Sequence, residues 1–220
     1  MTARERWRED LNRYVEASHD PHGFLRRLRI VLFSEGVWAI AVYRFGQYLY
    51  EEAPRPLRTL LRIPYEIARK ILVLAIGIHL SPETQIGPGF FISHFGGIWI
   101  NPRVRMGARC TIAHAITIGA PDAEVGAPVL GDRVWIGAGA VVTGPVQVGS
   151  GAVIGANSLV SSNVPENAVV VGVPARVLAY TGSDRLIARR STGPPAPGPE
   201  GARAVATAAG TSRADETPDS

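Results

Sequence analysis

The stretch VLGDRVWIGAGAVVTGPVQVGSGAVIGANSLV, residues 129 to 160, carries an aliphatic residue at every sixth position. These residues are Leu130, Ile136, Val142, Val148, Ile154 and Val160. A period of six fits neither the 3.6-residue turn of an α-helix nor the two-residue alternation of an ordinary β-strand. It is typical of a parallel β-helix, in which each hexad forms one flat face and three faces close a triangular coil.

The six-residue period extends back to about Leu80. A glycine or alanine often follows the aliphatic residue, in the pairs Ile86-Gly87, Met106-Gly107, Ile112-Ala113, Ile118-Gly119, Leu130-Gly131, Ile136-Gly137, Val148-Gly149 and Ile154-Gly155. The aliphatic side chain is expected to point inward, and the small residue lets the chain turn tightly at a corner. The sequence therefore predicts a mainly β fold, a parallel β-helix preceded by a helical region.

The phase of the repeat changes once. One phase holds Leu80, Ile86, Ile92 and Ile98, and the other begins at Ile100 and continues through Met106, Ile112 and Ile118. Two extra residues must therefore lie between Ile92 and Ile100, and Gly96 and Gly97 are the natural place for them. A second irregularity is PDAEVGAP, residues 121 to 128, where Glu124 stands at an aliphatic position. We expect a loop outside the coil there.

Three segments follow from these patterns. Residues 1–78 form an N-terminal helical region, because the text after Phe24 has helical spacing that APRP interrupts at 53–56. Residues 79–180 form the β-helix. Residues 181–220 are rich in Pro, Ala, Gly, Ser and Thr, which predicts a disordered tail.

Charge and composition narrow the possible partners. The net charge is +4, but no basic stripe is interleaved with stacking aromatic residues, so we expect no nucleic-acid partner. The N-terminal stretch MTARERWRED lacks the apolar core of a secretory signal, and the apolar run 71–78 is too short for a membrane span. With the single cysteine Cys110, this favours a cytoplasmic location.

Arginines on the N-terminal helices form a basic amphipathic face made of Arg26, Arg27, Arg29, Arg58, Arg62 and Arg69. We interpret it as a solvated face beside a packed apolar one. The alternative is peripheral contact with the inner face of a membrane.

Two histidines share one position in the repeat. His94 lies two residues after Ile92, and His114 lies two residues after Ile112. If the two inserted residues follow His94, both imidazoles lie on neighbouring coils about 4.8 Å apart. Irregular backbone on a rigid scaffold often carries a functional site. The alternative interpretation of each histidine is an ordinary surface or core residue.

A metal site is the poorer interpretation of the histidines. His79, His94 and His114 lack the short-range pair expected of a zinc site, and His19 and His22 lie outside the coils. We therefore expect no metal.

The segments IGPGFFISHFGGIWI, TIAHAITIG, VWIGAGAVVTG and VIGANSLVSSNVPENAVVVGVPARVL together resemble the serine acetyltransferase branch of the hexapeptide acyltransferases, over roughly residues 24 to 180. The resemblance implies a left-handed β-helix, a homotrimer and acetyl-CoA as acyl donor. It also implies that His94 is the general base that takes the proton of an acceptor hydroxyl. Imidazole suits this role because its pKa lies near working pH.

The resemblance has three departures. His79 and Ser93 stand where the family has carboxylates, and Ala127 stands where it has a second histidine near the acceptor. The segment HAITIG, residues 114 to 119, resembles the H-x-V/I-T-I-G segment of the colanic-acid type of acetyltransferases, which act in exopolysaccharide synthesis. We therefore expect acetyl transfer to a hydroxyl of a sugar or polysaccharide precursor, as a small molecule or on a lipid carrier. His114 would position the acceptor or the base.

Three other functions stay open at this point. Serine O-acetyltransferase is the first alternative, and a non-catalytic β-helix scaffold and a zinc γ-type carbonic anhydrase are the others. An assay with L-serine tests the first alternative. Absence of acetyl-CoA binding would favour the scaffold, and metal analysis tests the carbonic anhydrase.

The resemblance also implies a donor site, where pantetheine runs along the coils between subunits. Small residues are needed where it approaches the backbone, and Arg176 could pair with a phosphate at the nucleotide end. The expected residues are Thr117, Gly119, Gly137, Ala138, Ala156, Asn157, Pro174 and Arg176.

Overall fold

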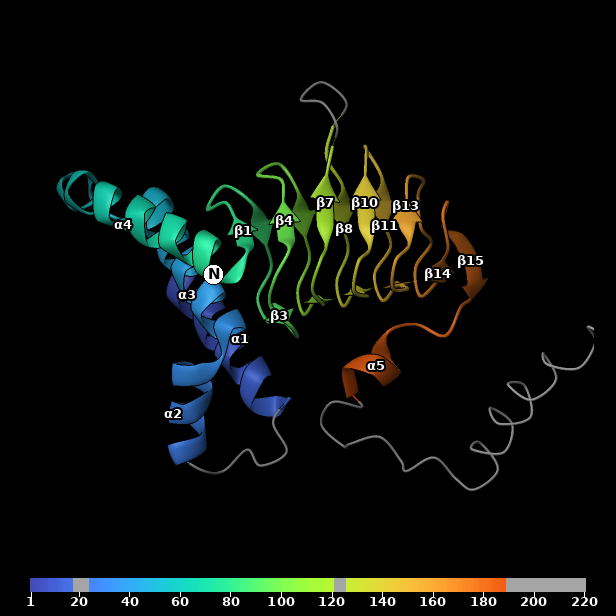
Figure 1. The fold of residues 1–220 in the computed structure, drawn as a ribbon, viewed down its shortest axis with the longest axis horizontal. Coiled ribbons are helices and arrows are strands. Elements are labelled where there is room, and N and C mark those ends of the chain that lie inside the picture. Colours follow the sequence, from blue (N-terminus) through green and yellow to red (C-terminus); the bar gives the residue numbers. More distant parts are fainter. Residues whose placement is uncertain (18–23, 121–125, 189–220) are drawn as a thin grey trace, which may run out of the picture.

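The structure is a computed structural model that describes residues 1–17, 24–120 and 126–188. Helices form its N-terminal part and a three-sided β-helix forms the rest (Figure 1). The helical elements are α1 (Ala3–Glu16), α2 (Phe24–Phe33), α3 (Glu35–Gln47), the π-helical turn η1 (Tyr48–Glu52), α4 (Arg55–Ile76) and, after the β-helix, α5 (Asp184–Ala188). The side chains of residues 24–27 and of Arg185 and Ala188 lie outside the described ones.

The strands form three sheets that are the faces of the prism. Face A contains β1 (Ile78–Leu80), β4 (Ile98–Ile100), β7 (Thr117–Gly119), β10 (Val141–Thr143) and β13 (Leu159–Val160). Face B contains β2 (Gln85–Ile86), β5 (Arg105–Met106), β8 (Val129–Leu130) and β11 (Gln147–Val148). Face C contains β3 (Phe91–Ile92), β6 (Thr111–Ile112), β9 (Trp135–Ile136), β12 (Val153–Ile154), β14 (Val169–Val171) and β15 (Arg176–Ala179). Paired strands are parallel, apart from the antiparallel pair β14–β15.

The aliphatic residues of the repeat fill the interior of the prism. Ile100, Ile112, Ile118, Ile136 and Ile154 are all fully buried. Consecutive members stack along the axis, since Ile112 aligns with Ile92 on one side and with Ile136 on the other. The predicted fold, a left-handed parallel β-helix behind a helical region, is confirmed.

The strand register locates both irregularities of the repeat. Ile92 aligns with Ile112, 20 residues later, whereas Ile100 aligns with Ile118, 18 residues later. The coil therefore gains two residues between Ile92 and Ile100, as the change of phase predicts. Strand β5 aligns with β8 through Met106 and Leu130, 24 residues apart. The expected loop at 121–128 accounts for this excess, and its residues 121–125 lie outside the described ones.

Side chains from α1 and α3 close the open end of the first coil. Arg44 donates to the carbonyl oxygens of Ile86 and Gly87, and its partner Asp10 accepts from the amide of Phe90. The Tyr43 hydroxyl donates to the Thr84 carbonyl oxygen at the same edge. A β-helix leaves unpaired backbone groups on its terminal coil, and these contacts satisfy them.

Three features of the helices were not indicated by the sequence pattern. A capping box at Thr2 and Glu5 begins α1 within a segment that has no apolar periodicity. Helix α5 lies inside the segment expected to be a disordered tail, whose residues 189–220 are outside the described ones. Helix α4 is only partly packed, because several of its aliphatic side chains are exposed. No helix in the described ranges is long and apolar enough to cross a membrane.

We predict that Arg44→Ala destabilises the protein strongly. The Arg44 and Asp10 side chains are 2% and 1% exposed, and the variant leaves a buried carboxylate without its cation. Removing one partner of such a pair costs about 3–5 kcal/mol, measured as the free energy of unfolding in urea. Glu16→Ala, which breaks the exposed Arg109–Glu16 pair, is the control and should cost below about 1 kcal/mol. Equal losses in the two variants would contradict the capping role.

We also predict that Cys110 is unreactive in the folded protein. Burial raises the pKa of its thiol to about 12, and only the thiolate attacks disulfide reagents. Ellman's reagent should therefore titrate no protein thiol at pH 8 and one thiol per chain in denaturant. Rapid modification of the native protein would show that the coil around Cys110 opens readily.

Candidate active site

His94 and His114 lie side by side on one edge of the prism, where face C turns into face A. His94 stands in the loop between β3 and β4, and His114 stands between β6 and β7. Both side chains are exposed. The ring centroids are 5.7 Å apart and the ring planes meet at 84°. The geometry therefore agrees with the repeat spacing, which predicted neighbouring imidazoles.

The inserted glycines bring the two histidines into line. The amide of Ala115 donates to the Gly96 carbonyl oxygen at 2.8 Å, so the longer loop lies against the next coil. Gly97 has a φ of 66°, and a Cβ there would lie 3.1 Å from the Cα of Ala115. Only glycine fits this close approach without strain.

Small residues continue the same edge beyond His114. Ala138 and Ala156 occupy the corresponding positions of the next two coils, each two residues after an aligned isoleucine. Backbone bonds tie these corners together, from the Gly139 amide to the His114 carbonyl oxygen at 3.0 Å and from Asn157 to Ala138 at 2.8 Å. The edge thus offers two imidazoles followed by a track with no bulky side chain.

The remaining donor-site candidates lie beside this edge. Thr117 and Gly119 are on β7, and a Cβ at Gly119 would lie 2.7 Å from the Trp99 ring. The turn that carries Pro174 reaches the end of the edge, because the amide of Ala175 donates to the Leu159 carbonyl oxygen. Arg176 follows this turn and is exposed. Gly137 is buried, and a Cβ there would lie 2.6 Å from the backbone nitrogen of Ala156, which is a requirement of coil stacking.

His79, the first departure from the family pattern, lies on face A. Its ring stacks on Trp99, with centroids 6.1 Å apart and an interplanar angle of 19°. Burial lowers the pKa of His79 below its usual value, and the positive charge of the nearby Arg69 lowers it further. The imidazole is therefore neutral at pH 7, and it belongs to the strand face rather than to the edge with His94.

The other two departures differ from each other. The Ser93 hydroxyl oxygen, directly before His94, is buried and meets no hydrogen-bond partner among the described residues. Ala127 packs against the hydrophobic core just before β8. The Ser93 hydroxyl is thus enclosed next to His94, and Ala127 supplies no polar group to the site.

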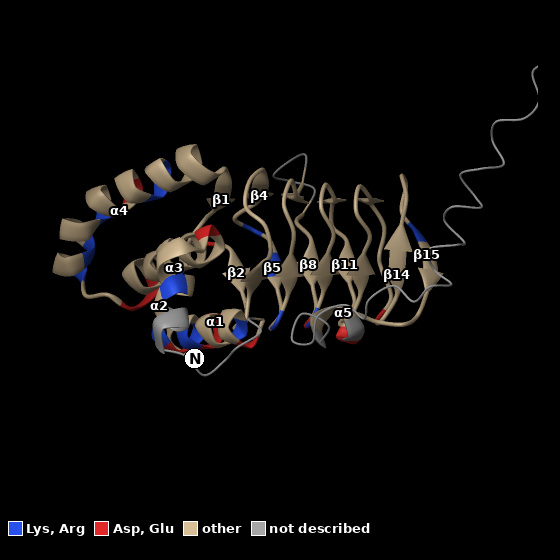
Figure 2. Ribbon diagram, turned by 60° about the horizontal axis from the view of Figure 1, so that its bottom comes forward, with Lys and Arg blue, Asp and Glu red and all other residues tan. Residues whose placement is uncertain are grey.

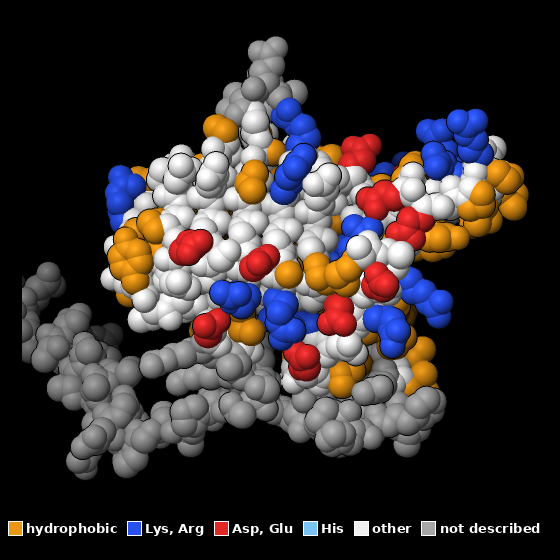
Figure 3. Space-filling view, turned by 180° about the vertical axis from the view of Figure 1, so that it is seen from behind, with side chains coloured by type: hydrophobic (Ala, Val, Ile, Leu, Met, Phe, Trp, Pro, Cys, Tyr) orange, Lys and Arg blue, Asp and Glu red, His pale blue; other side chains and the backbone are white. Residues whose placement is uncertain are grey.

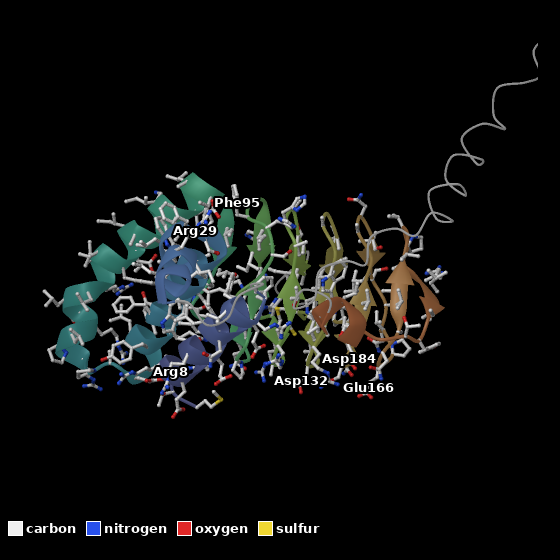
Figure 4. The ribbon with its side chains drawn as sticks, turned by 90° about the horizontal axis from the view of Figure 1, so that it is seen from below. Arg8, Arg29, Phe95, Asp132, Glu166 and Asp184 are labelled. Carbon is white, nitrogen blue, oxygen red and sulfur yellow. The ribbon has the colours of Figure 1, made fainter. Side chains whose placement is uncertain are left out.

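Asp132 and Glu166 lie on another edge of the prism, where face B turns into face C. Figure 4 shows Phe95, the neighbour of His94, on the opposite side from Asp132 and Glu166. Within the described ranges, no three His, Cys, Asp or Glu side chains are grouped closely enough to hold a metal ion.

Tyr14 is a supporting residue that sequence reasoning missed. Its hydroxyl donates to the Ile92 carbonyl oxygen and accepts from the Ile92 amide, both at 3.0 Å. These bonds hold the strand that leads into His94. No sequence signal pointed to them, because the two residues are 78 positions apart.

Comparison with known proteins gives consistent results. The model of the bacterial transferase hexapeptide (six repeats) family matches residues 127–162. The serine acetyltransferase of Mycobacterium tuberculosis is 37% identical over 156 residues, which are 70% of this chain and 65% of that protein. The serine acetyltransferase of Helicobacter pylori J99 is 35% identical over 154 residues, covering 68% of this chain and 84% of the relative.

Solved structures point the same way. A serine acetyltransferase from Brucella abortus matches with a TM-score of 0.69 and 27% identity, covering 82% of this chain and 70% of that one. A serine acetyltransferase in complex with CoA matches with a TM-score of 0.65 and 29% identity, covering 80% and 69%. The chain spans 65% of the length of the Mycobacterium relative.

These similarities correct two predictions. The sugar or polysaccharide acceptor is wrong, because the curated relatives are named serine acetyltransferases. The finer resemblance to exopolysaccharide acetyltransferases is likewise unsupported. The doubt about serine as acceptor gave most weight to His79 and Ala127, whereas the exopolysaccharide resemblance rested on the segment HAITIG, residues 114 to 119. The structure places His79 on a strand face and Ala127 against the core. Neither belongs to the edge that carries the two histidines.

Proposed function

Because the chain belongs to the serine acetyltransferase family, we propose that it transfers the acetyl group of acetyl-CoA to the hydroxyl oxygen of L-serine. The observation that carries this proposal is the pair of exposed imidazoles of His94 and His114 at the head of a track of small residues. Such an arrangement can hold a hydroxyl beside a base while a long, thin thioester lies along the coils.

In the proposed reaction, His94 accepts the proton of the serine hydroxyl as its oxygen attacks the thioester carbonyl. The tetrahedral intermediate collapses when the carbon–sulfur bond breaks. The His94 imidazolium then returns the proton to the departing thiolate, giving O-acetylserine and CoA. His114, whose ring meets that of His94 edge to face, positions the acceptor or the base.

The donor is proposed to follow the edge away from the histidines. Ala138, Ala156 and Asn157 would lie under the pantetheine arm, with the exposed Thr117 beside it. The buried Gly119 and Gly137 would serve the donor site indirectly, by letting Trp99 and the next coil pack closely beneath it. The turn with Pro174 would meet the nucleotide, and the exposed guanidinium of Arg176 would pair with a phosphate. A homotrimer, which the family resemblance implies, would complete the groove with a neighbouring subunit.

The direct test measures thiol release from acetyl-CoA with and without L-serine. The wild-type protein should release CoA only when serine is present, and His94→Ala should lower the rate by roughly 10²- to 10⁴-fold, the usual effect of losing a general base. Circular dichroism and the denaturation midpoint of the variant should stay unchanged, since the His94 side chain is exposed. A wild-type protein without serine-dependent release, or a fully active variant, would refute the proposal.

A second prediction concerns the track. Ala156→Leu should raise KM for acetyl-CoA about tenfold and leave KM for serine unchanged, because the larger side chain fills the path of the donor. Ser162→Leu, at an exposed corner position outside the track, is the matched control and should leave both constants unchanged. An unchanged acetyl-CoA KM in Ala156→Leu would place the donor elsewhere on the prism.

A further inference from the structure

Helix α4 exposes a stripe of aliphatic side chains. These are Leu60 (72% exposed), Ile63 (70%), Ile67 (55%), Ile71 (60%) and Leu74 (78%), hereafter the α4 stripe. Their spacing of three or four residues places them on one side of the helix. Figure 3 shows hydrophobic side chains gathered along α4, at the right of the view. Contiguous exposed apolar surface of this kind usually marks a binding surface.

The folding contacts of α4 use a different side of the helix. Leu57, Leu61 and Tyr65 pack into a small cluster with Leu49 of η1. An apolar groove of about 390 Å³ beside this cluster is lined by residues that include Phe45 of α3 and Pro64 of α4. The apolar surface therefore continues from the α4 stripe toward α3, and the stripe itself is not needed for packing within the chain.

The charged residues of α4 are almost all basic. Arg55, Arg62 and Lys70 are exposed and form no salt bridge within the described ranges. Lys70 lies one helical turn from Ile67 and from Leu74, at the border of the stripe. Glu66 is the one acidic residue of α4, and it pairs with Arg69 at 2.7 Å. Figure 2 shows this basic helix as an arch on the outside of the helical region.

We propose that α4 binds the surface of an anionic lipid membrane, with the α4 stripe immersed among the headgroups. An apolar side combined with a basic polar face is the pattern of helices that lie in the membrane interface. Negative lipid headgroups complement Lys70 at the border of the stripe and the exposed Arg55 and Arg62 on the polar face of the same helix. This inference is independent of the serine acetyltransferase proposal.

Flotation with lipid vesicles tests the inference on the full-length protein. The wild type should float with vesicles that contain phosphatidylglycerol and should float less with phosphatidylcholine alone. High salt should weaken binding, because it screens the basic residues. The double variant Ile67→Glu with Leu74→Glu should reduce the bound fraction at least about tenfold, since it places two charges in the stripe.

The matched control is Leu178→Glu with Tyr180→Glu. These apolar side chains, at the far end of the β-helix, are 71% and 65% exposed, and the control adds the same charge. It should float like the wild type, and vesicle-free thiol release should be equal in both double variants. Failure of the wild type to float would overturn the inference, as would equal flotation of the α4 variant. A second copy of the chain is the other possible occupant of the stripe. In that case the wild type would not float, and light scattering would give a smaller oligomer mass for the α4 variant than for the wild type.

Discussion

The buried pair of Arg44 and Asp10 closes the end of the β-helix on which every later coil is built. A coil in the middle of the prism finds backbone partners above and below, but the first coil has a neighbour on one side only. Arg44 fills this gap by donating to two carbonyl oxygens of the first coil, and Asp10 fills it by accepting from the Phe90 amide. Burial raises the pKa of the Asp10 carboxyl although Arg44 opposes the shift, so desolvation of the carboxylate is a real cost. The intact pair therefore adds little net stability, although removal of either partner is costly because it leaves the other charge buried alone. Its main role is to fix the position of the first coil against the helices.

The helices that close the first coil also hold the candidate site in place, through strand β3. Tyr14 of α1 holds both backbone groups of Ile92, and His94 lies two residues further along the chain. The Tyr14 ring also packs against Phe91, with centroids 4.5 Å apart. The loop with Gly96 and Gly97 begins directly after this clamped strand. The cap thus fixes one end of the loop, and the Ala115–Gly96 hydrogen bond fixes its middle against the next coil.

Sequence reasoning succeeded wherever the six-residue repeat itself carried the information. The period identified the inward residues, the change of phase located the insertion before Ile100, and counting from Ile92 and Ile112 paired the two histidines. It failed where contacts join distant segments without periodicity. The partners Asp10 and Arg44 are 34 residues apart, and nothing in their local sequence relates them. Helical spacing likewise showed that α4 is amphipathic but not which of its apolar side chains stay uncovered.

The acceptor was mistaken for a reason that lies in the architecture. The core of a β-helix constrains the inward residue of each hexad, whereas the outward residues can change one coil at a time without disturbing the stack. Substitutions such as His79 on face A therefore leave the edge with His94 and His114 intact, because each coil contributes its own side chain to that edge. A departure at one outward position says little about the chemistry at another. What persists is the alignment of two imidazoles with the small residues that follow them, and the inward isoleucines maintain that alignment from coil to coil.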